Sequence, residues 1–395
     1  MVDEKEATKI FDNLFFPKIF QTFRIAIHWK TVAIAFLAVA VICLAGWIMD
    51  FIFVAVSGSE GEGGVFSRLW YVSAESFHGA LAFLFAFNLL GVVKEIAGCF
   101  TAVGSIFKDH YIYCVVFFFI KLVMISICGG TICRIAALQF ARGERIGLTE
   151  ALHFSVKKFT SFFTAPLAPI VMIVLAGLCI FLLGLIGNIP RAGELLMGIF
   201  MFLALIAGAL ITVIMIGTIA GFNLMFPAIA YDDSDCFDAI SRSFSYIYSK
   251  PWRMGFYTAI AAVYGAVCYM FVRFFAFLLL WVTHRFLQLG ILGDNSKLTA
   301  IWPGPSFENL LGPSASATNW TQSFAGFLVR LCLLIVIGLV VSFIVSFYFS
   351  ANTIIYSLMR NRVDNTAMED VYIPFDESKT EPIKTESKPQ DVQQQ

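Results

Sequence analysis

The sequence predicts an all-α, polytopic transmembrane helix bundle of six spans, with interfacial amphipathic helices and an internal repeat. Three observations indicate this fold class: an apolar composition, a set of long apolar runs, and an uneven distribution of basic residues. Hydrophobic residues make up 59% of the 395-residue chain and charged residues 14%, and 43 residues are phenylalanine. A soluble domain could not bury so much apolar surface, whereas a helix that faces lipid does not need to.

The spans follow from the length of the apolar runs. A bilayer core of about 30 Å is crossed by about 20 helical residues. Six runs reach this length, and we expect spans at 31–53, 112–134, 166–187, 193–226, 256–283 and 324–350. The apolar run 79–93 is too short to cross without thinning the bilayer, so we expect it to be re-entrant or interfacial. Residues 284–323 then form an outer loop.

The basic residues predict the orientation. With six spans and both termini in the cytoplasm, the inside segments hold 18 of the 27 basic residues and the outside segments hold six. Lys and Arg are enriched in cytoplasmic loops, so we expect a multi-pass protein of the cell inner (cytoplasmic) membrane with both termini inside. A seventh span at 79–93 would invert the orientation of all segments on one side of it. The basic cluster at 142–158 and the basic N-terminus would then compete for the cytoplasmic side.

The two ends of the chain differ from the apolar middle. Residues 1–30 are expected to form a cytoplasmic amphipathic helix, because apolar residues recur at helical spacing between 10 and 27. No cleavable signal peptide is visible, since the first apolar run is long and begins some thirty residues in. The tail 364–395 is rich in Glu, Lys, Pro, Gln, Thr and Ser, which predicts a disordered cytoplasmic segment.

An internal repeat relates residues 149–159 to residues 237–247. Each copy follows a span, precedes another and has one apolar stripe, so both predict amphipathic helices on the cytoplasmic surface, at 148–163 and 235–249. One interpretation is a pseudo-symmetric pair of units that encloses a binding site, as in transporters built from repeats. The other is that these helices only seal the inner end of the bundle.

The second copy also carries a family resemblance. Residues 239–253 read Ala-Ile-Ser-Arg-Ser-Phe-Ser-Tyr-Ile-Tyr-Ser-Lys-Pro-Trp-Arg, which resembles the surface-helix motif of bacterial six-helix membrane proteins related to the glycerophosphodiester phosphodiesterase membrane domain. Residues 129–138 and 350–360 resemble uncharacterised planctomycete-type membrane proteins. The resemblance covers about 112–283 and implies a fold and a bacterial membrane. It implies no phosphodiesterase activity, because the chain has no room for the soluble barrel of about 250 residues.

Three cations within spans, Lys121, Arg273 and Arg330, are candidates for an anion-binding site near the outer leaflet. Charged side chains at this depth are costly and mark functional sites by default. If they converge, they could hold a carboxylate, a phosphate or an anionic headgroup. The alternative is that the arginines extend to the outer headgroups and that Lys121 bonds to backbone carbonyls.

The surface-helix motif supplies a second set of candidates, Asp238, Arg242, Ser243 and Trp252. We expect Arg242 to pair with Asp232 or Asp233 at the end of the preceding span, because Arg suits a fixed bidentate contact. Trp252 is expected to anchor the next span at the headgroups.

Enzymatic and cofactor-dependent functions lack their minimal parts in this sequence. The five histidines and nine cysteines show no metal-ligand spacing, so we expect no metal and no cofactor. No P-loop and no nucleophile or metalloprotease motif is present, and a net charge of zero gives no reason to expect a nucleic-acid partner. We therefore expect a non-enzymatic structural or accessory envelope protein that binds membrane lipids, a protein partner or a second copy of the chain. The alternative is a transporter or lipid-handling protein that uses the anion site.

Overall fold

The computed structural model describes residues 16–57, 64–291, 296–313 and 319–373, and every regular element in these ranges is a helix. The predicted all-α class is therefore confirmed. The helices, in chain order, are η1 (Phe16–Gln21), α2 (Thr22–Ala26), α3 (Trp29–Ser57), α4 (Val65–Phe85), α5 (Leu89–Asp109), α6 (Tyr111–Arg142), α7 (Leu148–Lys157), α8 (Phe159–Thr164), α9 (Ala168–Gly187), α10 (Ala192–Asp232), α11 (Cys236–Ser249), α12 (Pro251–Gly290), α13 (Ser296–Ile301) and α14 (Trp320–Val363).

Among the described residues, seven helices are long and apolar enough to cross a membrane, against the six predicted. Six of them, α3, α6, α9, α10, α12 and α14, correspond to the predicted spans, and the seventh is α5. Such a set of helices is that of a multi-pass membrane protein. Helix α12 runs on to Gly290 and α13 lies within 284–323, so part of the predicted outer loop is helical.

The run 79–93, expected to be re-entrant or interfacial, is not one continuous segment. This run contains the end of α4, a tight turn and the start of α5. Phe87 has a positive φ of 54° in the turn, and the Asn88 side chain caps α5 by accepting a hydrogen bond from the Gly91 amide at 2.9 Å. Helices α4 and α5 pack against each other as a hairpin, so the chain reverses direction at this turn.

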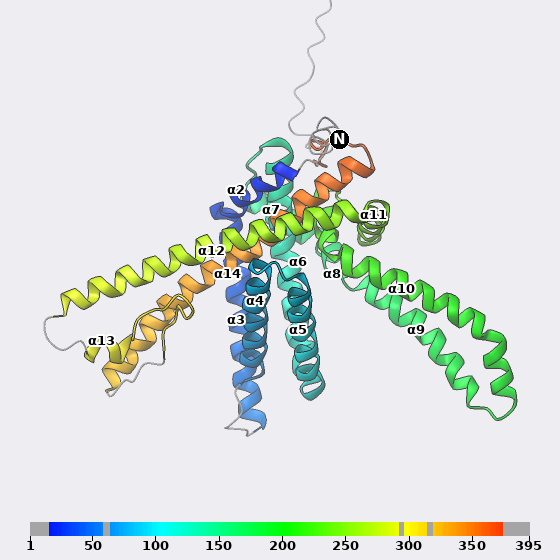
Figure 1. Ribbon diagram of the computed structural model, residues 1–395, viewed down its shortest axis with the longest axis horizontal. Helices are drawn as coiled ribbons and strands as arrows, with labels where there is room; N and C mark the ends of the chain where they lie inside the picture. Colours follow the sequence, from blue (N-terminus) through cyan, green and yellow to red (C-terminus); the bar gives the residue numbers. More distant parts are fainter. Residues whose placement is uncertain (1–15, 58–63, 292–295, 314–318, 374–395) are drawn as a thin grey trace, which may run out of the picture.

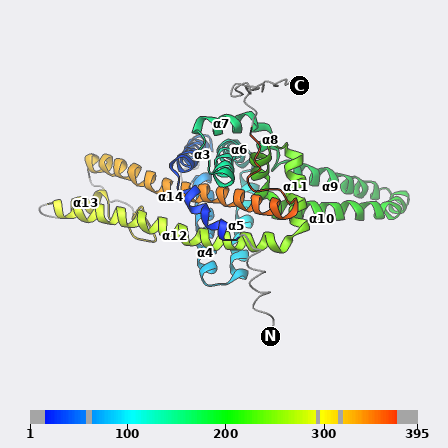
Figure 2. The same ribbon diagram turned by 90° about the horizontal axis from the view of Figure 1, so that it is seen from above.

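Three legs diverge from a common apex (Figure 1). The first leg contains α3 to α6, the second α9 and α10, and the third α12 and α14. Seen from above, the second and third legs point in opposite directions with the first between them (Figure 2). In each leg one helix runs outward from the apex and another returns to it. Short helices precede α3, α9 and α12, so the order of short helices, outgoing helix and return helix occurs three times in the described chain, with the α4–α5 hairpin inserted in the first.

The main hydrophobic core lies at the apex, where the return helices α6, α10 and α14 contact one another. Their C-terminal parts are buried there, including Ile132, Ile229 and Ile354 at 0% exposure. Beyond the apex the helices separate, and α9 buries none of its most apolar 18 residues. The outer parts of the legs therefore present apolar surface on most sides, which suits contact with lipid.

The predicted surface helices exist but are built into this core. Helices α7 and α8 cover the predicted 148–163, and α11 covers 235–249. Two glycines allow their close approach. A Cβ atom at Gly130 would meet the Ser155 hydroxyl at 2.5 Å, and one at Gly221 would meet the Ile247 side chain at 2.8 Å. Each short helix thus rests directly on the backbone of the return helix before it.

Both ends of the described chain also join the apex. In place of one predicted N-terminal helix there are two short helices, η1 and α2, and their Ile19 and Ile25 side chains are buried in the core. The predicted disorder of 364–395 is wrong for 364–373, because Val371 is 3% exposed and the Tyr372 amide donates to the Tyr231 carbonyl at 3.1 Å. Residues 1–15 and 374–395 lie outside the described residues.

Candidate functional site

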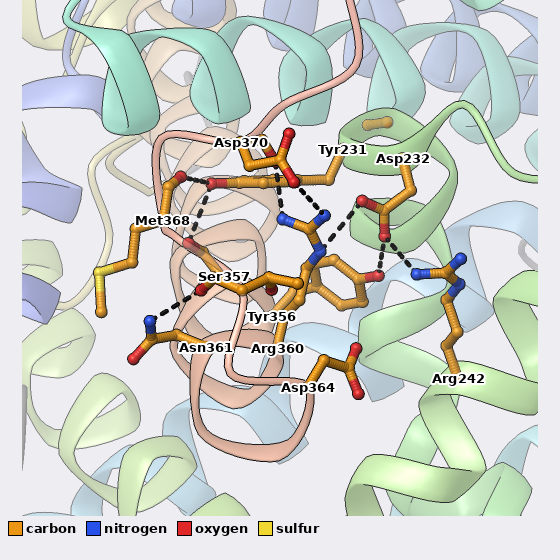
Figure 3. A network of polar contacts seen from close by, with 12 residues as sticks. Tyr231, Asp232, Arg242, Tyr356, Ser357, Arg360, Asn361, Asp364, Met368 and Asp370 are labelled. Atoms are coloured by element: carbon orange, nitrogen blue, oxygen red, sulfur yellow. Dashed lines mark hydrogen bonds and ion pairs between the residues drawn. The ribbon is translucent and has the colours of Figure 1, made fainter.

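Asp232 is the centre of a buried polar network at the apex (Figure 3). It is the last residue of α10, and its side chain is 7% exposed. One carboxylate oxygen lies 3.2 Å from Arg360 Nε, and the other lies 3.2 Å from Arg242 Nη1 and accepts a hydrogen bond from the Tyr356 hydroxyl. The network therefore links α10 to α11 and α14.

A second layer of contacts balances the charges of the two arginines. Arg242 Nε pairs with Asp238 at 3.0 Å, and Arg360 pairs with Asp370 at 3.4 Å. Burial lowers the pKa of Arg242, but the neighbouring carboxylates of Asp232 and Asp238 outweigh burial and raise this pKa above its usual value. These groups are bound to one another, so the network can fix helix positions but offers no free acid, base or nucleophile.

Two more cations hold the apex together from the first leg. The Arg134 side chain, on α6, donates to the Ala230 and Tyr372 carbonyls at 2.8 Å each and lies over the Phe154 ring. Lys158, between α7 and α8, pairs with Asp233 at 3.2 Å. Together they attach the end of α10 and the C-terminal segment 364–373 to the first leg and to α7.

The surface-helix candidates divide between two faces of α11. Asp238 and Arg242 lie in the Asp232 network, so the predicted pairing of Arg242 with an aspartate at the end of the preceding span is present. Ser243 is fully buried and faces Gly221 of α10. Trp252, at the start of α12, is 85% exposed.

The three intramembrane cations do not form the predicted common site. Among the described residues no contact joins any two of them. Lys121 lies over the Phe118 ring at 5.7 Å, and Arg330 borders a small cavity beside Trp302. The prediction grouped these three cations because they lie at similar depths in their spans. In the structure Lys121 belongs to the first leg, whereas Arg273 and Arg330 belong to the third leg, which diverges from the first (Figure 2).

Arg273 is instead a structural clamp. It is 9% exposed, and its Nη1 donates to the Tyr269 hydroxyl at 2.9 Å and contacts His78 Nε2 at 2.6 Å. Its Nη2 donates to the carbonyls of Phe307 and Glu308, both at 3.0 Å. The clamp ties α12 to α4 and to the segment 302–313. Sequence reasoning missed His78 and Tyr269 as partners, and only the i, i+4 spacing of Tyr269 and Arg273 could have indicated one of them.

A groove of about 370 Å³ lies between α12 and α14 and is closed on one flank by α4 and α5. We call it the lateral groove. Its walls are almost entirely apolar, with small residues such as Ala262 and Gly265 on α12 and large ones such as Phe347 on α14. Its volume falls in the range of small-molecule sites, about 300–1,000 Å³. No local sequence pattern predicts this groove, because its walls come from helices that are far apart in the chain.

The described residues contain no group of three or more His, Cys, Asp and Glu side chains that could hold a metal ion, and all nine cysteines are free. The fold and the site define an all-α, multi-pass membrane protein with a charged apex and an apolar groove. No family model, no curated protein and no solved structure matches the chain significantly, so the resemblance to bacterial six-helix membrane proteins stays a prediction.

Proposed function

We propose that this chain is a non-enzymatic component of a bacterial inner membrane that binds a membrane lipid in the lateral groove. The observation that carries the proposal is the groove itself, about 370 Å³ in volume and apolar, on helices that are apolar enough to cross a membrane. A groove in that position is open to lipid chains, and an acyl chain seated in it exchanges contacts with other lipids for contacts with Phe, Ala and Gly residues.

The orientation is part of the proposal. The apex, with its ion pairs and both described chain ends, lies in the cytoplasm, and the three legs cross the membrane. The contact between Lys18 Nζ and Met368 Sδ at 3.0 Å supports this, since it brings the two ends of the described chain together at the apex. The basic residues that surround the apex, including Arg142 and Arg145, favour the cytoplasmic side.

The internal repeat belongs to the same proposal in an extended form. We infer three repeated units, each a short helix, an outgoing helix and a return helix, with the α4–α5 hairpin inserted in the first. The support is the threefold order of elements and the similar contact of Ser155 with Gly130 and of Ser243 with Gly221. In this scheme the lateral groove lies where the inserted hairpin meets the third unit.

The transport alternative needs the three intramembrane cations to converge on one anion. Arg273 is bonded to Tyr269, His78 and two carbonyls, and Lys121 and Arg330 are not among its contacts. No observation on the described residues favours this alternative, so we retain lipid binding as the proposed function.

A photoreactive lipid tests the proposal. The full chain is reconstituted in vesicles that contain a phospholipid with a diazirine in its acyl chain, and crosslinked peptides are mapped. We expect crosslinks on the α12 segment from Ala262 to Tyr269. Ala262→Trp should reduce them about tenfold, because the indole displaces about two methylenes from the groove, worth about 0.8 kcal/mol each.

The matched control is Val263→Trp, which places the same indole on the neighbouring residue, 46% exposed and outside the groove. This variant should crosslink like the wild type. Absence of crosslinks at 262–269 in the wild type, or equal labelling of all three proteins, would show that the groove does not hold lipid.

A further inference from the structure

The inner end of the lateral groove contains polar groups that the protein does not use. Asn223 accepts a hydrogen bond from the Tyr348 hydroxyl at 2.5 Å through its oxygen, and its amide nitrogen has no partner among the described residues. The Asn352 nitrogen donates to the Tyr348 carbonyl at 2.9 Å, and within the part of the chain that the structure describes its side-chain oxygen has no partner. Both side chains line the groove, so one free donor and one free acceptor remain there.

Thr258 adds a hydroxyl to the same end of the groove. Helical threonines in this protein usually donate to the carbonyl four residues earlier, as Thr131 and Thr212 do at 2.6 and 2.9 Å. Thr258 makes no hydrogen bond among the described residues, although it lies within α12 and lines the groove. Because unused polar groups within apolar surroundings are costly, these three groups indicate that a polar ligand group sits beside them.

The groove is uncharged along its whole length. No Asp, Glu, Lys, Arg or His is among its lining residues, and Arg273, four residues beyond Tyr269 on α12, is bonded elsewhere. A phosphate or carboxylate placed at the inner end would have no counter-ion among the lining residues, and an unpaired charge in apolar surroundings is strongly disfavoured. The ligand that fits these walls is therefore uncharged at the group that enters the groove.

The remaining length of the groove suits one hydrocarbon chain. From Thr258 to Tyr269 the wall of α12 extends about 16 Å at 1.5 Å per residue. Its side chains are small at Ala261, Ala262, Gly265 and Ala266, which leaves a trough, and the Tyr269 ring closes the outer end. A ligand can thus place a polar group at the inner end and extend its chain outward through the membrane.

We propose that the lateral groove selects an uncharged single-chain lipid, or one chain of an uncharged lipid, whose hydroxyl and carbonyl groups bind Asn223, Thr258 and Asn352. This inference rests on the proposed function and adds the class of lipid. Asn223 donates to the ligand's carbonyl oxygen, Asn352 accepts from its hydroxyl group, and Thr258 can do either. Selection comes from the absence of any charge that could pair with an ionic headgroup.

The test compares two probes that differ only in a phosphate. The purified full chain is equilibrated with equal amounts of a monoacylglycerol and the lysophosphatidate of the same chain length, and bound lipid is measured by native mass spectrometry. We expect at least about tenfold preference for the monoacylglycerol. Thr258→Val and Asn352→Leu should each reduce its retention severalfold, whereas Thr212→Val, on the outer part of α10, should not.

Each outcome decides one of the two claims. Equal binding of both probes, with Ala262→Trp abolishing both, would overturn the selection for uncharged lipid and leave lipid binding in the groove intact. Retention that is unchanged in Thr258→Val and Asn352→Leu would overturn the assignment of the polar groups. Should neither probe bind and the photoreactive phospholipid also fail to label 262–269, the proposed function itself fails. Because Thr258→Val changes only a hydroxyl to a methyl group, it keeps the test valid if Asn352→Leu does not fold.

Discussion

One carboxylate, that of Asp232, serves two arginines that differ in burial. The Arg360 side chain is 10% exposed and the Arg242 side chain 36% exposed. A charge in the less exposed position depends more on its partner, because less water is available to replace that partner. The two ion pairs therefore contribute unequally to stability, although both distances to Asp232 are 3.2 Å.

This inequality predicts different losses of stability on substitution. Arg360→Ala should destabilise the protein by about 3 kcal/mol, because it removes a partner from a buried pair. Arg242→Ala should lower the free energy of unfolding by about 1 kcal/mol or less, because the Arg242 side chain is partly solvated and Asp232 keeps its ion pair with Arg360. Thermal unfolding in detergent measures both. Equal losses in the two variants, or a larger loss for Arg242→Ala, would contradict the ranking.

Sequence reasoning found one arginine of this network and not the other. Arg242 lies ten residues after Asp232, just beyond the turn between α10 and α11, so the pair is nearly local. Arg360 comes from a helix near the other end of the chain, and no periodicity relates it to Asp232. The same limit applies to the groove, where Asn223 and Asn352 come together only through tertiary packing.

At the scale of helices, the apolar runs were located correctly but their ends were not. The predicted span 324–350 stops where polar residues begin, yet α14 continues to Val363, because Ser350 and Thr353 are buried against other helices of the apex. Helix α4 was missed since its apolar residues are interrupted. Its first turn is capped by Asp50 of α3, which accepts from the Phe66 amide at 2.8 Å, a contact that no local pattern reveals.

The contact between α6 and the short helices can be tested with one methyl group. Gly130→Ala should cost about 1–3 kcal/mol, because its Cβ would displace the Ser155 hydroxyl from its bond to the Ile127 carbonyl and press on the buried Phe162 ring. The matched control is Gly177→Ala on α9, where a Cβ meets nothing within 4 Å. Alanine forms helices better than glycine, so Gly177→Ala should leave the free energy of unfolding unchanged or raise it by up to about 1 kcal/mol.

Thermal unfolding of the two glycine variants in the same detergent provides the comparison. A Gly130→Ala protein as stable as the Gly177→Ala protein would mean that α7 and α8 do not rest on α6 as described.

At the scale of the whole molecule, the three legs and the single apex require all turns at the leg tips to lie on one side of the membrane. A short epitope inserted at 143–147, between α6 and α7, should be protected in intact spheroplasts, from which the outer membrane has been removed. The same epitope at 188–191, between α9 and α10, should be accessible from outside. These loops lie at the apex and at the tip of the second leg (Figure 1). The measurement is antibody binding before and after permeabilisation, and access to both sites from the same side would contradict the topology.

The position of the core at the apex also has a consequence for biosynthesis. The ribosome must complete α14, the last of the three return helices, before Ile354 can meet Ile132 and Ile229. Until then the inserted hairpins have lipid around them but no common core, and the ion pairs of Asp232 are incomplete because Arg360 has not been made. Insertion and assembly are therefore separate events in time. A nascent chain that stops before α14 exposes polar apex surfaces to quality-control proteases, even though most of its membrane helices are already in place.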